Sequence, residues 1–179
     1  MAQDLPHIAS LKIAFTGPES SGKSSLSQAV ATYFDGQWHP EYARSYLLDR
    51  KGVYDYEDIE QIAIEQEAAR KLMSGTSLQC YDTEALVLYI WSTFKYQKCS
   101  KFVIALLENQ YFNHYILCDP TDVPWEYDPL REHPYQRQEL FELYLQKMQS
   151  MSLPFTVVRG NPGQRLQTVI DIIQNLRRH

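Results

Sequence analysis

Eight residues near the N-terminus constrain this chain more than any others. They occupy positions 17–24 and read G-P-E-S-S-G-K-S, directly after the apolar run 11–16 and directly before a stretch with helical periodicity. A strand, a glycine-rich loop and a helix in this order form a phosphate-binding loop. The sequence therefore predicts that the chain binds a nucleoside triphosphate.

Each part of this loop has a predicted task. Gly17 and Gly22 permit backbone angles that a side chain disfavours, so that successive N–H groups converge on the β-phosphate. Lys23 adds a charge for the β- and γ-phosphates, and the Ser24 hydroxyl is placed to ligate Mg²⁺. The residues expected to hold ATP are Gly17, Pro18, Glu19, Ser20, Ser21, Gly22, Lys23, Ser24 and Ser25.

Length and composition narrow the class of protein. The chain has 179 residues, 44% of them hydrophobic, which suits one domain over residues 1–179. Its net charge of −5 argues against a nucleic-acid surface. No apolar run approaches the roughly 20 residues that span a bilayer, and the N-terminus lacks the features of a secretory signal. We expect a soluble, cytoplasmic protein without nucleic-acid or membrane partners.

The rest of the chain alternates between strand and helix patterns. Strands are predicted at 11–16, 37–39, 78–82, 114–118 and 155–158, and helices at 22–34, 40–48, 56–72, 84–95, 102–112, 134–149 and 162–178. Such alternation is typical of a parallel sheet covered on both faces. The expected fold class is α/β: a three-layer P-loop fold with a doubly wound sheet of about five parallel strands.

Ligands of such sheets bind beyond the carboxyl ends of the strands, where this sequence places several polar residues. Asp82 ends the third strand, where it can serve Mg²⁺ or orient a hydroxyl, and its alternative role is to cap the next helix. Glu41 follows the second strand and can take a proton from an acceptor hydroxyl, or it is a solvated loop acid. Tyr42 and Arg44 come next, and Arg44 is either a substrate clamp or half of a surface ion pair.

Residues 119–137 contain four prolines and are predicted to form a lid. Arg131 and Arg137 can reach from it toward a transferring phosphoryl group, or they form ion pairs with nearby glutamates. Trp125 has no obvious core to fill. Its ring can stack on a flat substrate, or it anchors the lid to the body of the protein.

Together these motifs resemble a known family. The ordered set is G-P-E-S-S-G-K-S-S-L, E-Y-A-R, Y-D-T-E and P-W-E-Y-D-P-L-R-E followed by Arg137. It is similar to the ribosylnicotinamide kinase domain of the NadR family, which belongs with the P-loop kinases and AAA-like ATPases. The resemblance implies ATP- and Mg²⁺-dependent phosphorylation of the ribose 5′-hydroxyl of nicotinamide riboside, giving nicotinamide mononucleotide for NAD synthesis.

The resemblance also implies roles for individual residues. Glu41, Tyr42 and Arg44 would line the riboside pocket, Trp125 would lie near the nicotinamide ring, Arg131 and Arg137 would belong to the lid, and Asp82 would serve Mg²⁺ or the hydroxyl. The chain departs from the family at Pro129, where Gly is frequent, and at Glu84, where Asp is also common. We expect neither the DNA-binding domain nor the adenylyltransferase domain of longer NadR proteins.

The predicted reaction is in-line transfer of the γ-phosphoryl group, assisted by Lys23, Arg131 and Arg137. Either Asp82 or Glu41 receives the hydroxyl proton, and the sequence leaves that choice open. One alternative function is another nucleoside or nucleoside-monophosphate kinase, and another is a regulatory P-loop ATPase. A GTPase is disfavoured because the guanine-reading pattern N-K-x-D is missing from the sequence.

Overall fold

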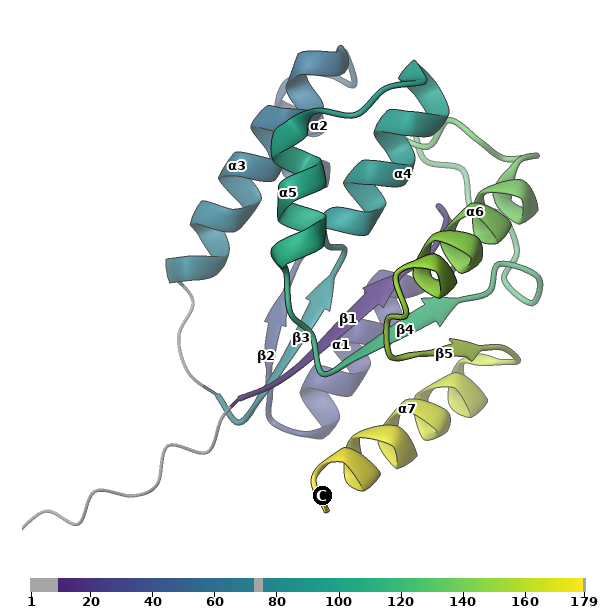
Figure 1. Cartoon of the computed structure of the whole chain (residues 1–179). Coiled ribbons are helices and arrows are strands. Elements are labelled where there is room, and N and C mark those ends of the chain that lie inside the picture. The colour runs from purple at the N-terminus through teal and green to yellow at the C-terminus, as the bar shows by residue number, and fades with distance from the viewer. Residues whose placement is uncertain (1–9, 73–75, 179) are drawn as a thin grey trace, which may run out of the picture.

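The computed structural model describes residues 10–72 and 76–178. Within them five strands form one parallel sheet: β1 (Leu11–Thr16), β2 (Gln37–His39), β3 (Leu78–Asp82), β4 (His114–Cys118) and β5 (Phe155–Val158). Their order across the sheet is β2-β3-β1-β4-β5 (Figure 1). The predicted α/β class and doubly wound parallel sheet are confirmed.

The helices connect the strands in the predicted order. They are α1 (Lys23–Tyr33), α2 (Tyr42–Asp49), α3 (Tyr56–Leu72), α4 (Ala85–Tyr96), α5 (Lys101–Asn109), α6 (Arg137–Ser150) and α7 (Pro162–Leu176). Most bounds differ from the prediction by at most two residues, and two differ by three. Helix α5 ends three residues early because Gln110 is extended and Asn113 must donate its backbone N–H to Lys12 O, 2.9 Å away, as the chain enters the sheet. Helix α6 starts three residues late because the backbone N–H groups of Glu132 and His133 are held by the Glu19 carboxylate.

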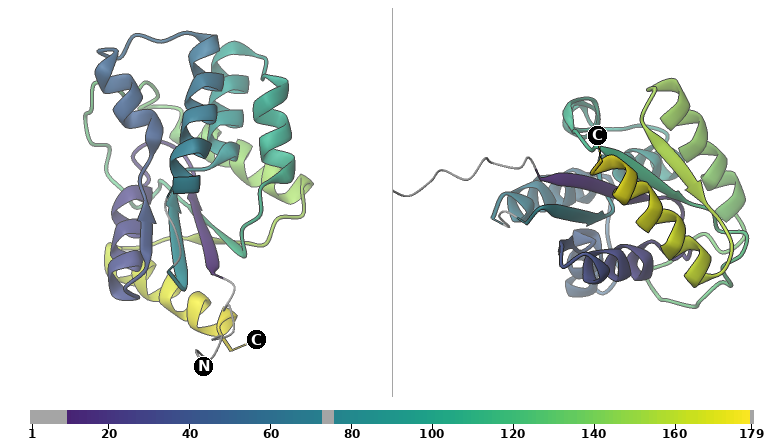
Figure 2. Two further views of the ribbon diagram at one scale, coloured as in Figure 1. Left: turned by 90° about the vertical axis from the view of Figure 1, so that its left-hand side faces the viewer. Right: turned by 90° about the horizontal axis from the view of Figure 1, so that it is seen from below.

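The helices cover both faces of the sheet, and alternating strand residues fill the two cores (Figure 2). Ile13 and Phe15 of β1 point into the core under α1 and α7, whereas Ala14 faces the core under α4, α5 and α6. All three residues are fully buried. Because both sides are covered, the central strands are mainly apolar, which made them readable from sequence.

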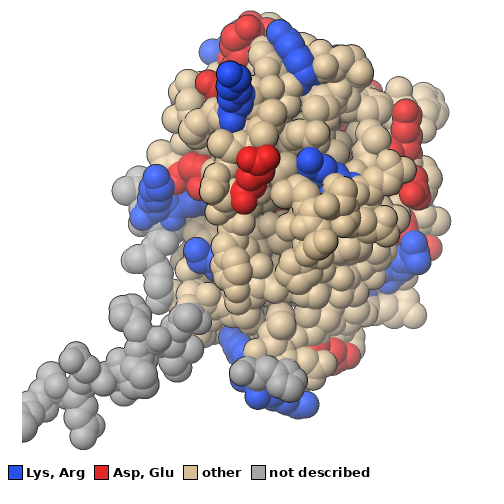
Figure 3. Space-filling model, viewed as in Figure 1, with Lys and Arg blue, Asp and Glu red and all other residues tan. Residues whose placement is uncertain are grey.

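The surface carries charges of both signs. On the face shown in Figure 3, Lys and Arg side chains are interspersed with Asp and Glu. Among the described residues no helix is both long enough and apolar enough to cross a membrane.

The sheet topology creates a cleft above β1. Strands β3 and β4 follow each other along the chain but flank β1 on opposite sides, so the chain changes direction there. Ligands of open α/β sheets bind at such a point, beyond the carboxyl ends of the strands. Helices α2, α3, α4 and α5 rise past these ends (Figure 1), and residues of α2 and α4 line the cleft.

Candidate active site

The loop after β1 adopts the strained, close-packed course of a phosphate-binding loop. Gly17 has φ +129°, and a Cβ there would lie 2.8 Å from the carbonyl oxygen of Cys118 in β4. Ser20 and Gly22 also have positive φ, 50° and 81°. Glycine at position 17 is therefore required both by its backbone angle and by the approach to the neighbouring strand.

Helix α1 begins at Lys23, so its N-terminus points at the loop with unpaired N–H groups and a positive dipole end. The Lys23 ammonium donates to the carbonyl oxygen of Pro18 at 2.7 Å, which folds it across the loop. This end of the helix is suited to an anion such as a phosphate.

Asp82 lies beneath this loop, 1% exposed, at the end of β3. Burial raises its pKa, while the neighbouring Ser24 hydroxyl and the charges of Lys23 and Arg44 oppose that rise. Its Oδ1 atom has no hydrogen-bond partner among the described residues. A buried carboxylate oxygen without a partner beside a serine hydroxyl fits a Mg²⁺ ion, which prefers such oxygen ligands and keeps several waters.

The capping role that the sequence offered for Asp82 belongs to another residue. The N-cap of α4 is Glu84, whose carboxylate accepts the N–H of Leu86 at 2.6 Å. It also accepts the side-chain amide of Gln110 at 2.7 Å. Asp82 is therefore not needed for the helix and is left for the site.

Glu41 stands at the N-cap position of α2 but makes no side-chain cap. It lines the cleft instead. Burial, and then the negative charge of Asp82, raises the pKa of Glu41 to about 7, against the opposing charges of Lys23 and Arg44. A carboxyl group with a pKa near neutrality can hold or release a proton under physiological conditions.

One cavity joins the loop to the helical walls and has a volume of about 680 Å³. Its floor and one side are the phosphate-binding loop and the start of α1, and Glu41 and Arg44 lie on its wall. Four aromatic side chains complete the far side: Tyr54, Trp91, Phe94 and Tyr144. The cavity is large enough for two small molecules, and its far side suits a flat organic one.

Three predicted contact residues do not line this cavity: Tyr42, Trp125 and the buried Asp82. Tyr42 does not line it, and its hydroxyl donates to Glu65 of α3. The half-buried ring of Trp125 also does not line it and lies 6.0 Å and 5.8 Å from the guanidinium carbons of Arg131 and Arg137. Both arginines belong to the same segment, residues 119–137, so these contacts lie within the predicted lid.

The three predicted arginines have different surroundings. Arg131 lines the cavity and donates to the Ser20 hydroxyl at 3.3 Å. Arg137 does not line it and donates to the carbonyl oxygens of Ser20 and Val123 at 3.0 and 2.8 Å, which joins lid and loop. Arg44 lines the cavity and also forms an ion pair with Asp128 at 2.5 Å.

The lid segment, residues 119–137, is held against the phosphate-binding loop by side chains of that loop. The Glu19 carboxylate accepts the backbone N–H groups of Glu132 and His133 at 3.0 and 3.2 Å. The Ser20 hydroxyl accepts the N–H of Glu126 at 3.1 Å. Movement of either segment would therefore be transmitted to the other.

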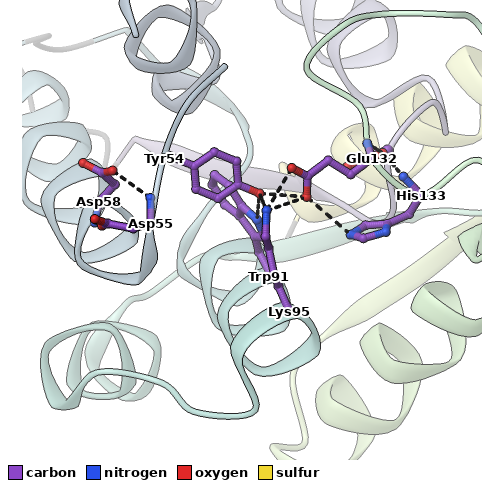
Figure 4. Close-up of polar contacts among 8 residues, drawn as sticks. Tyr54, Asp55, Asp58, Trp91, Lys95, Glu132 and His133 are labelled. Atoms are coloured by element: carbon purple, nitrogen blue, oxygen red, sulfur yellow. Dashed lines mark hydrogen bonds and ion pairs between the residues drawn. The ribbon is translucent and has the colours of Figure 1, made fainter. Parts of the chain in front are cut away.

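A second set of contacts ties the lid to the aromatic wall (Figure 4). The Tyr54 hydroxyl donates to Glu132 at 2.8 Å and accepts from the indole N–H of Trp91 at 2.9 Å. Lys95 donates to Tyr54 at 2.7 Å and to both Glu132 oxygens at 2.9 Å. We call Tyr54, Trp91, Lys95 and Glu132 the latch, because they join the α2–α3 connection, α4 and the lid.

Arg165 of α7 supports the loop from below. The residue is 4% exposed, and its guanidinium group donates to the carbonyl oxygens of Ser21, Asp119 and Gly160 at 2.8, 2.6 and 2.8 Å. These oxygens belong to the phosphate-binding loop and the segments after β4 and β5. One side chain thus fixes three of the loops that surround the cleft.

Among the described residues no group of three or more His, Cys, Asp or Glu side chains is arranged to hold a metal ion. The Asp82 and Ser24 pair would rely on phosphate and water oxygens for the remaining Mg²⁺ ligands.

A family model described as an AAA domain matches residues 12–165, which include the loop, both cleft walls, the lid and Arg165. The chain belongs to this AAA domain family. No curated protein matches the sequence significantly.

Solved structures share the fold of this AAA domain. Two crystal structures of NadR protein, one in complex with NAD and AMP-PNP and one in complex with NR, superpose with a TM-score of 0.77 at 15% and 17% identity. Each match covers 93% of this chain and 49% or 51% of the NadR chain, so the chain spans about half the length of these proteins. A deoxyadenosine kinase from M. mycoides with bound dATP matches with a TM-score of 0.59 and 12% identity over 92% of this chain and 99% of its own. This chain therefore shares its fold with the NadR structures and with this deoxyadenosine kinase.

Several site residues of this AAA domain were not found from the sequence. Tyr54 lies in a polar connection with no motif, and Arg165 looks like the polar face of an amphipathic helix. Trp91 and Phe94 carried a usable signal, since positions 87, 90, 91 and 94 of α4 share one helix face and all line the cavity. An apolar stripe on a helix does not reveal whether it faces a core or a cavity.

Proposed function

We propose that this protein is an ATP-dependent kinase that phosphorylates the 5′-hydroxyl of a riboside, with nicotinamide riboside as the acceptor. The observation that carries the proposal is the position of Glu41. Its carboxyl group, with a pKa raised to about 7, lies on the wall of a cavity that has a phosphate-binding loop on one side and aromatic rings on the other. A proton acceptor between a triphosphate site and a chamber for a flat molecule is what a nucleoside kinase requires.

The donor half would hold ATP through the loop residues 17–25, with Lys23 moving from the Pro18 carbonyl to the phosphates. Ser24 and Asp82 would hold Mg²⁺, which neutralises phosphate charge when bound. Arg131 is placed to reach the γ-phosphate because it already lines the cavity beside Ser20. We assign residues 1–179 to one kinase domain and residues 119–137 to its lid.

The proposed reaction is a single displacement at the γ-phosphorus of ATP. The acceptor hydroxyl oxygen forms a bond to the γ-phosphorus as the bond from that phosphorus to the β,γ-bridging oxygen breaks, and ADP leaves. The hydroxyl proton passes to the carboxylate of Glu41. We assign Asp82 to the metal, because a bound cation would favour its deprotonated form, and Glu41 to the proton.

The identity of the acceptor draws support from two sources. The sequence motifs resemble the ribosylnicotinamide kinase domain, and the NadR structures that share this fold bind NR in one case and NAD with AMP-PNP in the other. Deoxyadenosine kinase shares the fold less closely, so a deoxynucleoside is the second candidate.

A coupled assay of ADP release tests the proposal with one acceptor at a time: nicotinamide riboside, deoxyadenosine, thymidine or uridine. We expect Mg²⁺-dependent turnover with nicotinamide riboside at a kcat/KM at least about tenfold above the others. If the enzyme preferred deoxyadenosine, that nucleoside would take the place of nicotinamide riboside as the proposed acceptor. ADP release without any acceptor would favour a regulatory ATPase.

A further inference from the structure

The phosphate-binding loop carries a negative charge as well as a positive one. Its charged residues are Glu19 and Lys23, and both line the large cavity. A carboxylate beside a triphosphate site repels the nucleotide, because the two charges have the same sign. Glu19 therefore needs a role that compensates for this repulsion.

The contacts of Glu19 lie in the lid. Its Oε2 atom accepts the backbone N–H groups of Glu132 and His133 at 3.0 and 3.2 Å. These residues belong to neither a helix nor a strand, and among the described residues their N–H groups have no other hydrogen-bond partner. Since the acceptor is ionised, these hydrogen bonds are stronger than those between neutral groups.

The two N–H groups held by Glu19 directly follow Arg131. On the other side, the backbone N–H of Arg131 donates to the carbonyl oxygen of Asp128 at 3.0 Å. Its guanidinium group donates to the Glu126 carbonyl at 2.7 Å and to the Ser20 hydroxyl at 3.3 Å. The backbone is thus fixed on both sides of a cation that lines the cavity beside the loop.

The latch holds the same segment from another direction. The Glu132 carboxylate faces Tyr54 and Lys95, whereas its backbone N–H faces Glu19 (Figure 4). The latch does not replace Glu19, because a side-chain contact leaves the backbone N–H groups without a partner. Glu19 therefore sets the course of the chain just after Arg131.

We propose that Glu19 is a positioning residue, whose carboxylate holds the lid backbone at residues 132 and 133 so that Arg131 meets the γ-phosphate of ATP. The inference rests on the proposed function, because that function places Arg131 at this phosphate. ADP has no γ-phosphate. Loss of Glu19 should therefore weaken the binding of a triphosphate and slow its transfer, but leave the binding of ADP almost unchanged.

Calorimetric titration with Mg²⁺ and either AMP-PNP or ADP tests the inference. Glu19→Ala should weaken AMP-PNP binding about tenfold and change ADP binding by less than about twofold. In the ADP-release assay its kcat should fall about tenfold, with little change in the KM of the acceptor. Glu139→Ala is the matched control and should change none of these values, because Glu139 is exposed in the first turn of α6 and does not line the cavity.

Two conservative variants separate hydrogen bonding from charge. Glu19→Gln loses the charge but keeps an acceptor oxygen, so it should weaken AMP-PNP binding by no more than about threefold. Glu19→Asp keeps the charge, but its shorter side chain withdraws the oxygens from the lid. It should resemble Glu19→Ala, and it makes the same test if Glu19→Ala fails to fold.

Two results would overturn the inference at this stage. If Glu19→Gln lost as much AMP-PNP affinity as Glu19→Ala, the carboxylate would act through its charge and not by holding the lid. If Glu19→Ala bound both nucleotides at least as tightly as the wild type, Glu19 would be only a loop acid that repels phosphate.

A double-mutant cycle shows whether Glu19 acts through Arg131. Arg131→Ala alone should weaken AMP-PNP binding about 20-fold, and adding Glu19→Ala should then cost less than about twofold. Losses that multiply in the double variant would mean that the two residues act independently, which would overturn the inference.

These titrations contain no acceptor, so they separate the two proposals. If the wild type phosphorylated no riboside but Glu19→Ala still lost affinity for AMP-PNP and not for ADP, the kinase would be rejected and the role of Glu19 kept. If the wild type phosphorylated a riboside and Glu19→Ala had the nucleotide affinities of the wild type, the role of Glu19 would be rejected and the kinase kept. Absence of AMP-PNP binding to the wild type would reject both.

Discussion

The two halves of the cleft are built in different ways. The donor half is one continuous stretch in which β1, the loop and α1 follow one another, and its anion site consists mainly of backbone N–H groups. The acceptor half takes side chains from α2, the α2–α3 connection, α4, α6 and the lid, at positions as far apart as Glu41, Trp91 and Tyr144.

This difference determines how each half tolerates change. A backbone site depends on a few residues that set its course, above all Gly17, whereas a side-chain site spreads its binding energy over many groups. We therefore expect large effects from single changes in the donor half and graded effects in the acceptor half.

The largest effect should come from Lys23→Met. The change removes the only cation of the loop and should lower kcat by about 10³-fold, because phosphoryl transfer depends on charge neutralisation. Steady-state ADP release measures it, with the exposed Lys101→Met as the control. A fall in kcat of less than tenfold would show that the backbone N–H groups of the loop stabilise the transferring phosphate without Lys23. Single changes in the donor half would then have effects as small as those expected in the acceptor half.

Glu41→Gln should lower kcat by about 10²-fold and abolish the acidic limb of its pH profile. Because the pKa of Glu41 is raised to about 7, wild-type kcat should fall as the pH drops below 7 and the base becomes protonated. Asp82→Asn should instead raise the Mg²⁺ concentration needed for half-maximal rate. If the pH profile of Glu41→Gln matched that of the wild type, Asp82 rather than Glu41 would be the group that accepts the proton.

The same substitution has a consequence for stability with a defined sign. The folded pKa of Glu41 lies above the ordinary value of 4.5, so between pH 4.5 and 7 the folded protein binds more protons than the unfolded chain. Wild-type stability should therefore decline across that range as the pH rises. Glu41→Gln should melt about 5 °C higher than wild type at pH 8, and the gap should close toward pH 5. A constant gap would exclude titration as its cause.

Gly17→Ala should destabilise the protein by about 2 kcal/mol, because its Cβ would lie 2.8 Å from the Cys118 carbonyl at an unfavourable φ. Thermal unfolding measures the change. Gly163→Ala is the matched control: its Cβ would meet only the Asn161 side chain, at 3.4 Å, in the first turn of α7. If both variants lost the same free energy of unfolding, the close approach of Gly17 to Cys118 would not be what destabilises Gly17→Ala.

The smallest effect should come from the latch. Glu132→Gln weakens its hydrogen bonds with Tyr54 and Lys95, which are partly exposed, so we expect the KM of the acceptor to rise about threefold with little change in kcat. Kinetics at saturating ATP measure it. A tenfold fall in kcat would mean that lid closure limits turnover and that the acceptor half also depends on single residues.

The sequence revealed the donor half more fully than the acceptor half for the same physical reason. The apolar residues of the strands and the spacing of residues within the loop are local features of the sequence. The sheet, the loop and the position of Asp82 at the end of its strand could therefore be predicted where they are observed. Tyr42 was selected because it follows the second strand and from the family resemblance, and Trp125 because its ring had no obvious core to fill. In the structure Tyr42 turns toward Glu65 and Trp125 toward two arginines. Which way a ring turns depends on partners distant in sequence, and a single chain without coordinates does not show them.

The contacts of Arg165 imply an order in which the phosphate-binding loop and its support form during synthesis. The loop at residues 17–24 is synthesised before the guanidinium group that fixes its Ser21 carbonyl, because Arg165 of α7 lies 144 residues further along the chain. A growing chain that still lacks α7 would have the motif but not its support, so the loop would be held in its final shape only after α7 is made.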